Sequence, residues 1–158
     1  MRREERYPET ASYVFYNANP KHRITGDCWL RAICTGLGED YNEVLKEMVD
    51  VHLKTGYELS CDKAVDMYLA GKGWVKHKQP RKHDNTKYTG KEFCRWLSIN
   101  YADGELGNVI CNIGGHHMVA IKATNHGDGY NCRYKVHDTW NSTGGCIGNY
   151  WTKGGKAA

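Results

Sequence analysis

The sequence predicts a single α+β domain, with helices in the first half of the chain and antiparallel strands in the second. The length of 158 residues fits one domain of ordinary size. Apolar residues recur at helical spacing in the first half, whereas the second half holds short β-like runs separated by Gly, Asn and Asp. Helices followed by antiparallel strands are typical of the α+β class. Residues 1–12 and 153–158 are expected to be flexible tails of this domain.

The first two predicted helices begin at recognisable start signals. The first covers residues 28–37, directly after a Gly-Asp turn. The second covers residues 41–54, with Asp40 as its expected N-cap and Glu43 completing a capping box. One apolar stripe of the second helix is expected to face the core, formed by Val44, Leu45, Met48, Val49 and Leu53.

Two further helices are predicted before the strands begin. The third covers residues 61–70 and stops at Gly71. The fourth starts at Thr89, where Glu92 three residues on again fits a capping box. The residues of these two helices that are expected in the core are Ala64, Val65, Tyr68, Leu69, Phe93, Trp96 and Leu97.

The segment between the third and fourth helices is strongly basic. Residues 72–91 hold seven Lys or Arg and a single acid, Asp84. This composition, broken by a proline, favours a solvated loop. The alternative is a patch for nucleic acid or an acidic partner, although Trp74 and Tyr88 are the only aromatic residues interleaved with the charges for bases to stack on.

Four strands are predicted in the second half, at residues 108–113, 117–124, 132–138 and 147–151. Residues 126–129 are expected to form a hairpin turn centred between positions 127 and 128. Symmetric antiparallel pairing about that centre places His117 opposite Asp138 and Val119 opposite Val136. These residues then share one apolar face of the hairpin, whereas the other face is more polar.

The charge balance and the hydropathy argue against nucleic-acid and membrane proteins. The 22 Lys and Arg exceed the 18 Asp and Glu by four, a surplus too small to indicate nucleic-acid binding. No stretch approaches the roughly 18 uninterrupted apolar residues of a membrane span. No apolar run follows the basic N-terminal residues, as a secretory signal would require. A cytoplasmic protein is therefore expected.

The seven cysteines do not form the pattern of a disulfide framework or a metal site. Their number is odd, and no two are spaced as C-x-x-C. Most are therefore expected to be buried thiols in a reducing compartment. Cys28 differs, because it lies where a glycine-bearing turn meets the first turn of a helix. Free N–H groups and the helix dipole favour a thiolate there, whereas Cys34, inside the helix, is expected to stay protonated.

A nucleophilic cysteine needs a base and a group that orients the base, and the predicted hairpin offers both. His117 is the candidate base and Asp138 its partner, with His116 on the opposite face as the reserve. The alternative is a hydrogen-bonded pair that only ties the end of the hairpin. Asp27 is expected to cap the helix that begins at Cys28.

Two more residues near these candidates have expected supporting roles. Arg31, one turn beyond Cys28, is expected to pair with a carboxylate and hold its helix in place. Trp140 follows Asp138 by two positions, and either covers the His–Asp pair or belongs to the core.

These residues resemble papain-like cysteine peptidases, in which a cysteine at a helix start, a histidine on a strand and an Asp or Asn beyond the next strand act together. A stronger resemblance is to small phage and prophage proteins of papain-like type, and it covers roughly residues 15–151. The motifs that carry it are Asn17-Ala-Asn-Pro20, Gly26-Asp-Cys-Trp-Leu-Arg-Ala-Ile33, His116-His-Met-Val-Ala120 and Asp138-Thr-Trp-Asn-Ser142.

The resemblance implies a papain-like fold and a thiol hydrolase acting on a peptide or isopeptide bond of a peptide or protein substrate. It implies the triad Cys28, His117 and Asp138, and no metal or organic cofactor. Papain-like enzymes usually carry a Gln six residues before the cysteine, where this chain has His22. The oxyanion donor is then His22, Asn17 or Asn19, or the backbone N–H of Cys28 acting with another amide.

Two alternatives to hydrolysis remain open at this point. The same triad would serve a transglutaminase-like acyl transferase, because water and an amine attack with help from the same enzyme groups. The scaffold would also suit a non-catalytic, phage-encoded binding protein that uses the basic loop 72–91.

Overall fold

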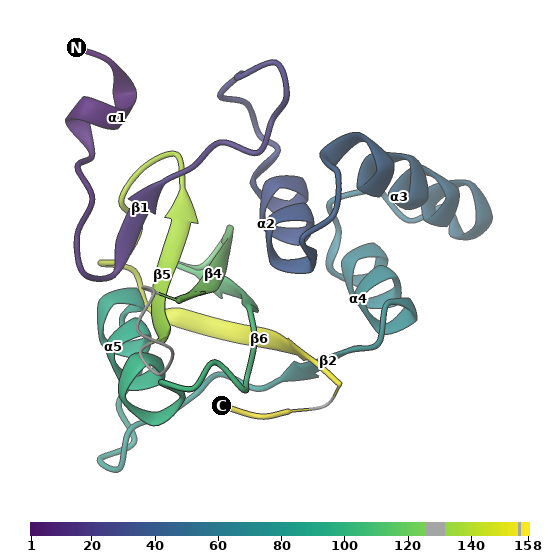
Figure 1. Cartoon of the computed structure of the whole chain (residues 1–158). Helices are drawn as coiled ribbons and strands as arrows, with labels where there is room; N and C mark the ends of the chain where they lie inside the picture. Colours follow the sequence, from purple (N-terminus) through teal and green to yellow (C-terminus); the bar gives the residue numbers. More distant parts are fainter. Residues whose placement is uncertain (126–131, 155) are drawn as a thin grey trace.

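A computed structural model describes residues 1–125, 132–154 and 156–158, and these build one mixed sheet with helices on both of its faces (Figure 1). The six strands lie in the order β1-β5-β4-β3-β6-β2. Their bounds are Tyr13–Phe15 (β1), Trp74–His77 (β2), Val109–Ile113 (β3), His117–Asn125 (β4), Cys132–Asp138 (β5) and Ile147–Lys153 (β6). β1 runs parallel to β5, and every other neighbouring pair is antiparallel.

The helices divide between the two faces of the sheet. They are α1 (Arg3–Arg6), α2 (Cys28–Leu37), α3 (Tyr41–Thr55), α4 (Asp62–Gly71) and α5 (Gly90–Asn100). Figure 1 shows α2, α3 and α4 gathered on one side of the sheet, with α5 on the other. The chain is therefore an α+β protein, as the sequence predicts.

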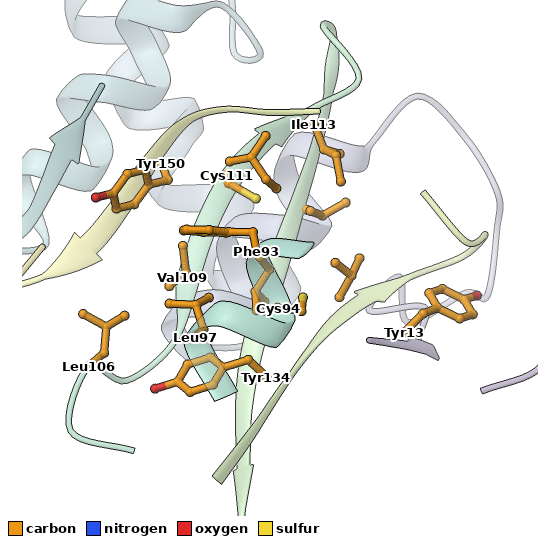
Figure 2. Packing of buried hydrophobic residues seen from close by; sticks show 14 residues of the cluster. Tyr13, Phe93, Cys94, Leu97, Leu106, Val109, Cys111, Ile113, Tyr134 and Tyr150 are labelled. Carbon is orange, nitrogen blue, oxygen red and sulfur yellow. The ribbon is translucent and has the colours of Figure 1, made fainter. Parts of the chain in front are cut away.

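The side chains of β3 point alternately to the two faces of the sheet, and each face has its own hydrophobic core. Val109, Cys111 and Ile113 pack with Phe93 of α5, in the cluster that Figure 2 shows. Ile110, between them, packs with α2 and α4 on the other face. Successive side chains of a strand point to opposite faces, so a strand buried on both sides carries a continuous apolar run.

The four predicted helices are present, close to the predicted bounds. Asp40 caps α3, since its side chain accepts a hydrogen bond from the N–H of Glu43, and Thr89 forms a capping box with Glu92. The predicted apolar stripe of α3 is wrong at its far end, because Val49 and Leu53 are exposed. α3 lies outside α2 and α4, so its neighbours cover only part of its apolar face.

The predicted register of the β4–β5 hairpin is wrong by two residues. Ile121, not Val119, lies opposite Val136, and Ala120 lies opposite His137. The predicted turn at 126–129 lies outside the described residues. Register depends on how many residues the turn uses, which composition does not specify. Because side chains alternate with a period of two, the shift leaves every residue on the face predicted for it.

The structure also differs from the prediction at the two edges of the sheet. β1 and β2 were not expected, and β2 lies within the basic segment 72–91 predicted as loop. β1 pairs in parallel with β5, and β2 pairs with β6.

Both segments expected to be flexible tails contain ordered contacts. Arg3, in α1, donates from Nε to the Thr139 carbonyl at 2.6 Å. At the other end, the Lys156 ammonium donates to the Glu105 carbonyl at 2.7 Å. None of the helices in the described part of the chain is long and apolar enough to cross a membrane.

Candidate active site

The candidate nucleophile Cys28 is the first residue of α2, a helix buried along most of its length. The helix ends at Gly38, whose left-handed backbone forms the C-cap. Buried side chains such as Leu30 and Ile33 fix the helix against the sheet, while Cys28 itself is half-buried. The thiol therefore lies at a rigid helix N-terminus, where unpaired N–H groups favour a negative charge.

The candidate base His117 is the first residue of β4 and meets both Cys28 and Asp138. The tight turn before it uses Gly114 and Gly115, whose φ angles of 62° and 95° favour glycine. The Nε2 atom of His117 donates to Oδ2 of Asp138 at 2.6 Å, and the imidazole is close enough to the Cys28 thiol for each group to shift the pKa of the other. The structure thus brings the three predicted triad residues together.

The thiol and the imidazole shift each other's titration. Burial raises the pKa of Cys28, but hydrogen bonds from His117 and the backbone N–H of Met118, with the charges of His117 and Arg31, outweigh it and hold the pKa below the ordinary value. Burial lowers the pKa of His117, but its bonds to Asp138 and Cys28 outweigh this and raise the pKa to about 9. The two shifts together favour a thiolate–imidazolium pair near neutral pH.

The Asp138 carboxylate is buried and fully surrounded by donors. Its Oδ2 accepts from His117 and, at 2.9 Å, from the Ser142 hydroxyl. Its Oδ1 accepts from the Thr139 N–H at 2.7 Å and from Nη1 of Arg31 at 3.3 Å. These four donors hold the carboxylate in one orientation, so it can hold the imidazole in place.

Arg31 links this carboxylate to a second buried one. Its Nε donates to Oδ1 of Asp27 at 2.9 Å, while its Nη1 reaches Asp138. The other oxygen of Asp27 accepts from the Tyr41 hydroxyl at 2.7 Å and the Asn19 amide at 3.0 Å. Arg31 therefore pairs with a carboxylate as expected, and its second contact, which the sequence does not indicate, joins α2 to the end of β5.

The expected capping role of Asp27 is only half right. Asp27 occupies the N-cap position of α2, but its side chain makes no capping hydrogen bond. The carboxylate turns instead toward Arg31, because a buried charge needs a counter-ion.

Trp140 and His116 line a cavity beside the triad. The cavity has a volume of about 520 Å³ and extends past Asn141 to Gly145. The centroids of the Trp140 and His117 rings are 5.3 Å apart, so Trp140 covers the candidate base. Trp140 is 38% exposed and does not belong to the core. β4 begins at His117 as predicted, but His116 lies exposed in the turn before it instead of on the opposite face of the hairpin.

None of the three candidate oxyanion side chains hydrogen-bonds to Cys28, His117 or Asp138 among the described residues. The Asn19 amide donates to Asp27 and Tyr41, so it supports the buried ion pair instead. The Asn17 amide donates to the Arg23 carbonyl at 3.2 Å. His22 is exposed and has a left-handed backbone, with φ of 55°.

The buried thiols differ from Cys28 in the direction of their pKa shifts. All seven cysteines are free. Burial raises the pKa of Cys34 to about 11 and that of Cys94 to about 12, and it raises the pKa of Cys111 well above its ordinary value. Most of the seven cysteines were predicted to be buried, and this prediction is wrong because only these three are buried.

No family model, curated protein or solved structure matches this chain. Within the described residues, no group of three or more His, Cys, Asp or Glu side chains is placed to hold a metal ion. Function therefore has to be inferred from the residues and geometry of this chain.

Proposed function

We propose that the protein is a papain-like cysteine hydrolase that cleaves a peptide or isopeptide bond. One observation carries the proposal: the half-buried Cys28 at the start of α2 lies close enough to His117 for the imidazole to lower the pKa of the thiol, and Nε2 of His117 donates to the buried carboxylate of Asp138. A thiol, a base and an orienting carboxylate in this order are the working parts of nucleophilic acyl chemistry. A helix packed against an antiparallel hairpin that carries the base also supports the papain-like fold.

In the first half of the reaction, the Cys28 thiolate attacks the carbonyl carbon of the scissile bond. The oxygen of the tetrahedral intermediate takes the negative charge, and the backbone N–H of Cys28 at the helix N-terminus supplies a donor for it. The His117 imidazolium then gives its proton to the leaving amine as the carbon–nitrogen bond breaks. An acyl-thioester on Cys28 and a neutral imidazole result.

In the second half, neutral His117 takes a proton from water, and the resulting hydroxide attacks the thioester. Collapse of the second intermediate releases the acid product and restores the thiolate and the imidazolium. Asp138 keeps Nε2 protonated throughout, so the other ring nitrogen is the one that exchanges protons with the reacting groups. Trp140 shields this hydrogen bond from bulk water on one side.

The proposal is tested by measuring thiol reactivity and cleavage on the same protein. Iodoacetamide labelling followed by peptide mass spectrometry should show Cys28 reacting faster than Cys146 at pH 6, although Cys146 is the more exposed thiol. A peptide library digested with the protein should show cleavage that is lost in Cys28→Ala and kept in Cys146→Ala. Equal labelling of both thiols, or cleavage that survives in Cys28→Ala, would refute the proposal.

Acyl transfer is separated from hydrolysis by adding a primary amine to the same digests. Products that carry the amine in place of the new carboxylate would identify a transferase. Products that carry a free carboxylate at high amine concentration would identify a hydrolase.

A further inference from the structure

A second and larger cavity lies next to the one beside His117. It has a volume of about 890 Å³ and lies between the segment before β1, the exposed side of α5 and the start of β5. Asn141 lines both this cavity and the smaller one beside His117 and Trp140. The two cavities thus adjoin at Asn141, with segment 141–145 between them, and together they are called the groove below.

The far part of this groove is basic. Lys91 and Arg95 lie four residues apart on α5, so they share one face of the helix, and Arg133 of β5 lines the same cavity. No Asp or Glu lines it among the described residues. The nearest acid on the N-terminal segment, Glu9, forms an ion pair with Lys135 at 2.7 Å.

These three cations have no counter-ion within the described part of the chain. None of Lys91, Arg95 and Arg133 takes part in an ion pair or a side-chain hydrogen bond there. Five lysines elsewhere in the chain are paired: Lys46 with Glu43, Lys72 with Glu39 and Glu47, Lys76 with Asp66, Lys82 with Glu92 and Lys135 with Glu9. The groove therefore presents positive charge that is available to a bound anion.

The walls of the groove are held in fixed positions relative to the triad. The N–H of Lys91 donates to the Thr143 carbonyl at 3.0 Å, and the N–H of Gly90 donates to the Gly145 carbonyl at 2.9 Å. The segment 141–145 that receives these bonds also forms the wall of the cavity beside His117. A chain bound at the basic end would therefore keep a constant distance from Cys28.

We infer that this groove binds an acidic stretch of the polypeptide substrate, rich in Asp or Glu, and so directs a neighbouring bond to Cys28. The inference rests on the proposed hydrolase function, because it makes the groove an extension of the reaction site. A peptide fits better than a nucleic acid, since no aromatic residue lines the basic part for bases to stack on.

The test measures binding separately from cleavage. The Cys28→Ala protein is titrated with two fluorescent Gly-Ser peptides that differ only in a run of Glu or of Gln, at about 0.1 M salt, where charges more than about 10 Å apart are screened. The Glu peptide should bind about tenfold more tightly, as expected for three exposed charge contacts. The triple variant Lys91→Gln, Arg95→Gln, Arg133→Gln should lose this preference.

A matched variant controls for net charge. Lys46→Gln, Lys54→Gln and Lys63→Gln remove the same charge from exposed positions of α3 and α4, on the other side of the sheet. This variant should keep the preference for the Glu peptide. Equal loss in both triple variants, equal affinity for the Glu and Gln peptides, or a labelled oligonucleotide that binds the groove in place of the Glu peptide, would overturn the inference.

Failure of the proposed function gives a different result. If the wild-type protein cleaves no peptide but the groove variant still loses the Glu preference, the groove binds acidic peptides but the hydrolase proposal fails, and with it the role of the groove in directing a bond to Cys28. If peptides are cleaved with the same kcat/KM whether they carry Glu or Gln, the hydrolase proposal stands and the groove inference fails.

Discussion

Replacing Arg31 with methionine should destabilise the fold by about 3 kcal/mol, since breaking a buried ion pair from one side typically costs about 3–5 kcal/mol. The guanidinium lies between two buried carboxylates, Asp27 at 2.9 Å and Asp138 at 3.3 Å. Methionine fills similar space but leaves both without the cation. Each carboxylate keeps other donors, such as Tyr41 for Asp27 and Ser142 for Asp138, which places the loss at the lower end of the range.

The loss of stability should depend on pH. Burial raises the pKa of Asp27, but hydrogen bonds from Tyr41, Asn19 and Arg31 outweigh it and hold the pKa below its ordinary value of 3.8. A carboxylate of this kind stabilises the fold above its ordinary pKa, and this contribution is lost as the pH falls through the lowered value. Without Arg31 the pKa of Asp27 is lowered less. The difference in unfolding free energy between the wild-type protein and Arg31→Met should therefore be largest at neutral pH and should become smaller in acid.

Urea titrations at pH 7 and at successively lower pH, followed by tryptophan fluorescence, measure this deficit. The thermal midpoint at pH 7 should fall by about 6–12 °C, from roughly 2–4 °C per kcal/mol for a domain of this size. Arg95→Met is the control, because Arg95 is exposed and has no ion pair within the described residues; its effect should stay within about 0.5 kcal/mol. A deficit for Arg31→Met below about 1 kcal/mol, or one that is the same at every pH, would refute the reasoning.

Three further predictions concern the triad. Cys28→Ala should abolish hydrolysis in a peptide-cleavage assay and leave the thermal midpoint nearly unchanged, whereas the buried Cys34→Ser should cost roughly 1–3 kcal/mol in urea titrations and keep activity. His117→Ala should lower kcat by several orders of magnitude, Asp138→Asn should lower it by about 10²–10⁴-fold because it disturbs only the orientation and tautomer of the base, and His116→Ala should have a mild effect. The plot of kcat/KM against pH should be bell-shaped. Activity should rise in acid as the Cys28 thiol, whose pKa is lowered, ionises, and it should fall near pH 9 as His117, whose pKa is raised to about 9, loses its proton.

Each of these predictions has a result that contradicts it. An inactive Cys34→Ser beside an active Cys28→Ala would show that the nucleophile is wrong. An inactive His116→Ala beside an active His117→Ala would assign the base to the turn instead of the strand. A rate that keeps rising above pH 10 would mean that no protonated imidazole is needed.

The parts of the fold that depend on local signals are predictable from the sequence. The bounds of α2 follow from Gly26-Asp27 before it and Gly38 after it, and β5 is bounded as predicted. The pairing of His117 with Asp138 was also predicted, although from a register two residues out. A register shift of two residues leaves His117 and Asp138 on the same face of the hairpin, so their side chains still meet although they are not directly opposite each other.

The parts that depend on distant partners are not predictable in this way. β1 has three residues, and it is a strand only because Val136 and its neighbours accept it at the edge of the sheet. The contact between Arg31 and Asp138 joins positions 107 residues apart. The position of Arg31, one turn after Cys28, predicts an ion pair with a carboxylate. The residues around Arg31 do not indicate that Asp138 is the second carboxylate it contacts.

The parallel pairing of β1 with β5 has a consequence for how the protein is made. Phe15 lies beside Asp138, and the N–H of Tyr16 donates to the Asp138 carbonyl at 2.9 Å. β1, which precedes Cys28 in the chain, therefore cannot pair until β5, which ends at Asp138, has been synthesised. A ribosome adds roughly 5–20 residues per second, and each contact must await its later partner. The nascent chain therefore carries Cys28 for several seconds with neither His117 nor Asp138 yet synthesised. During synthesis the Cys28 thiol has neither partner beside it, and the chain acquires the candidate nucleophile only after Asp138 has emerged.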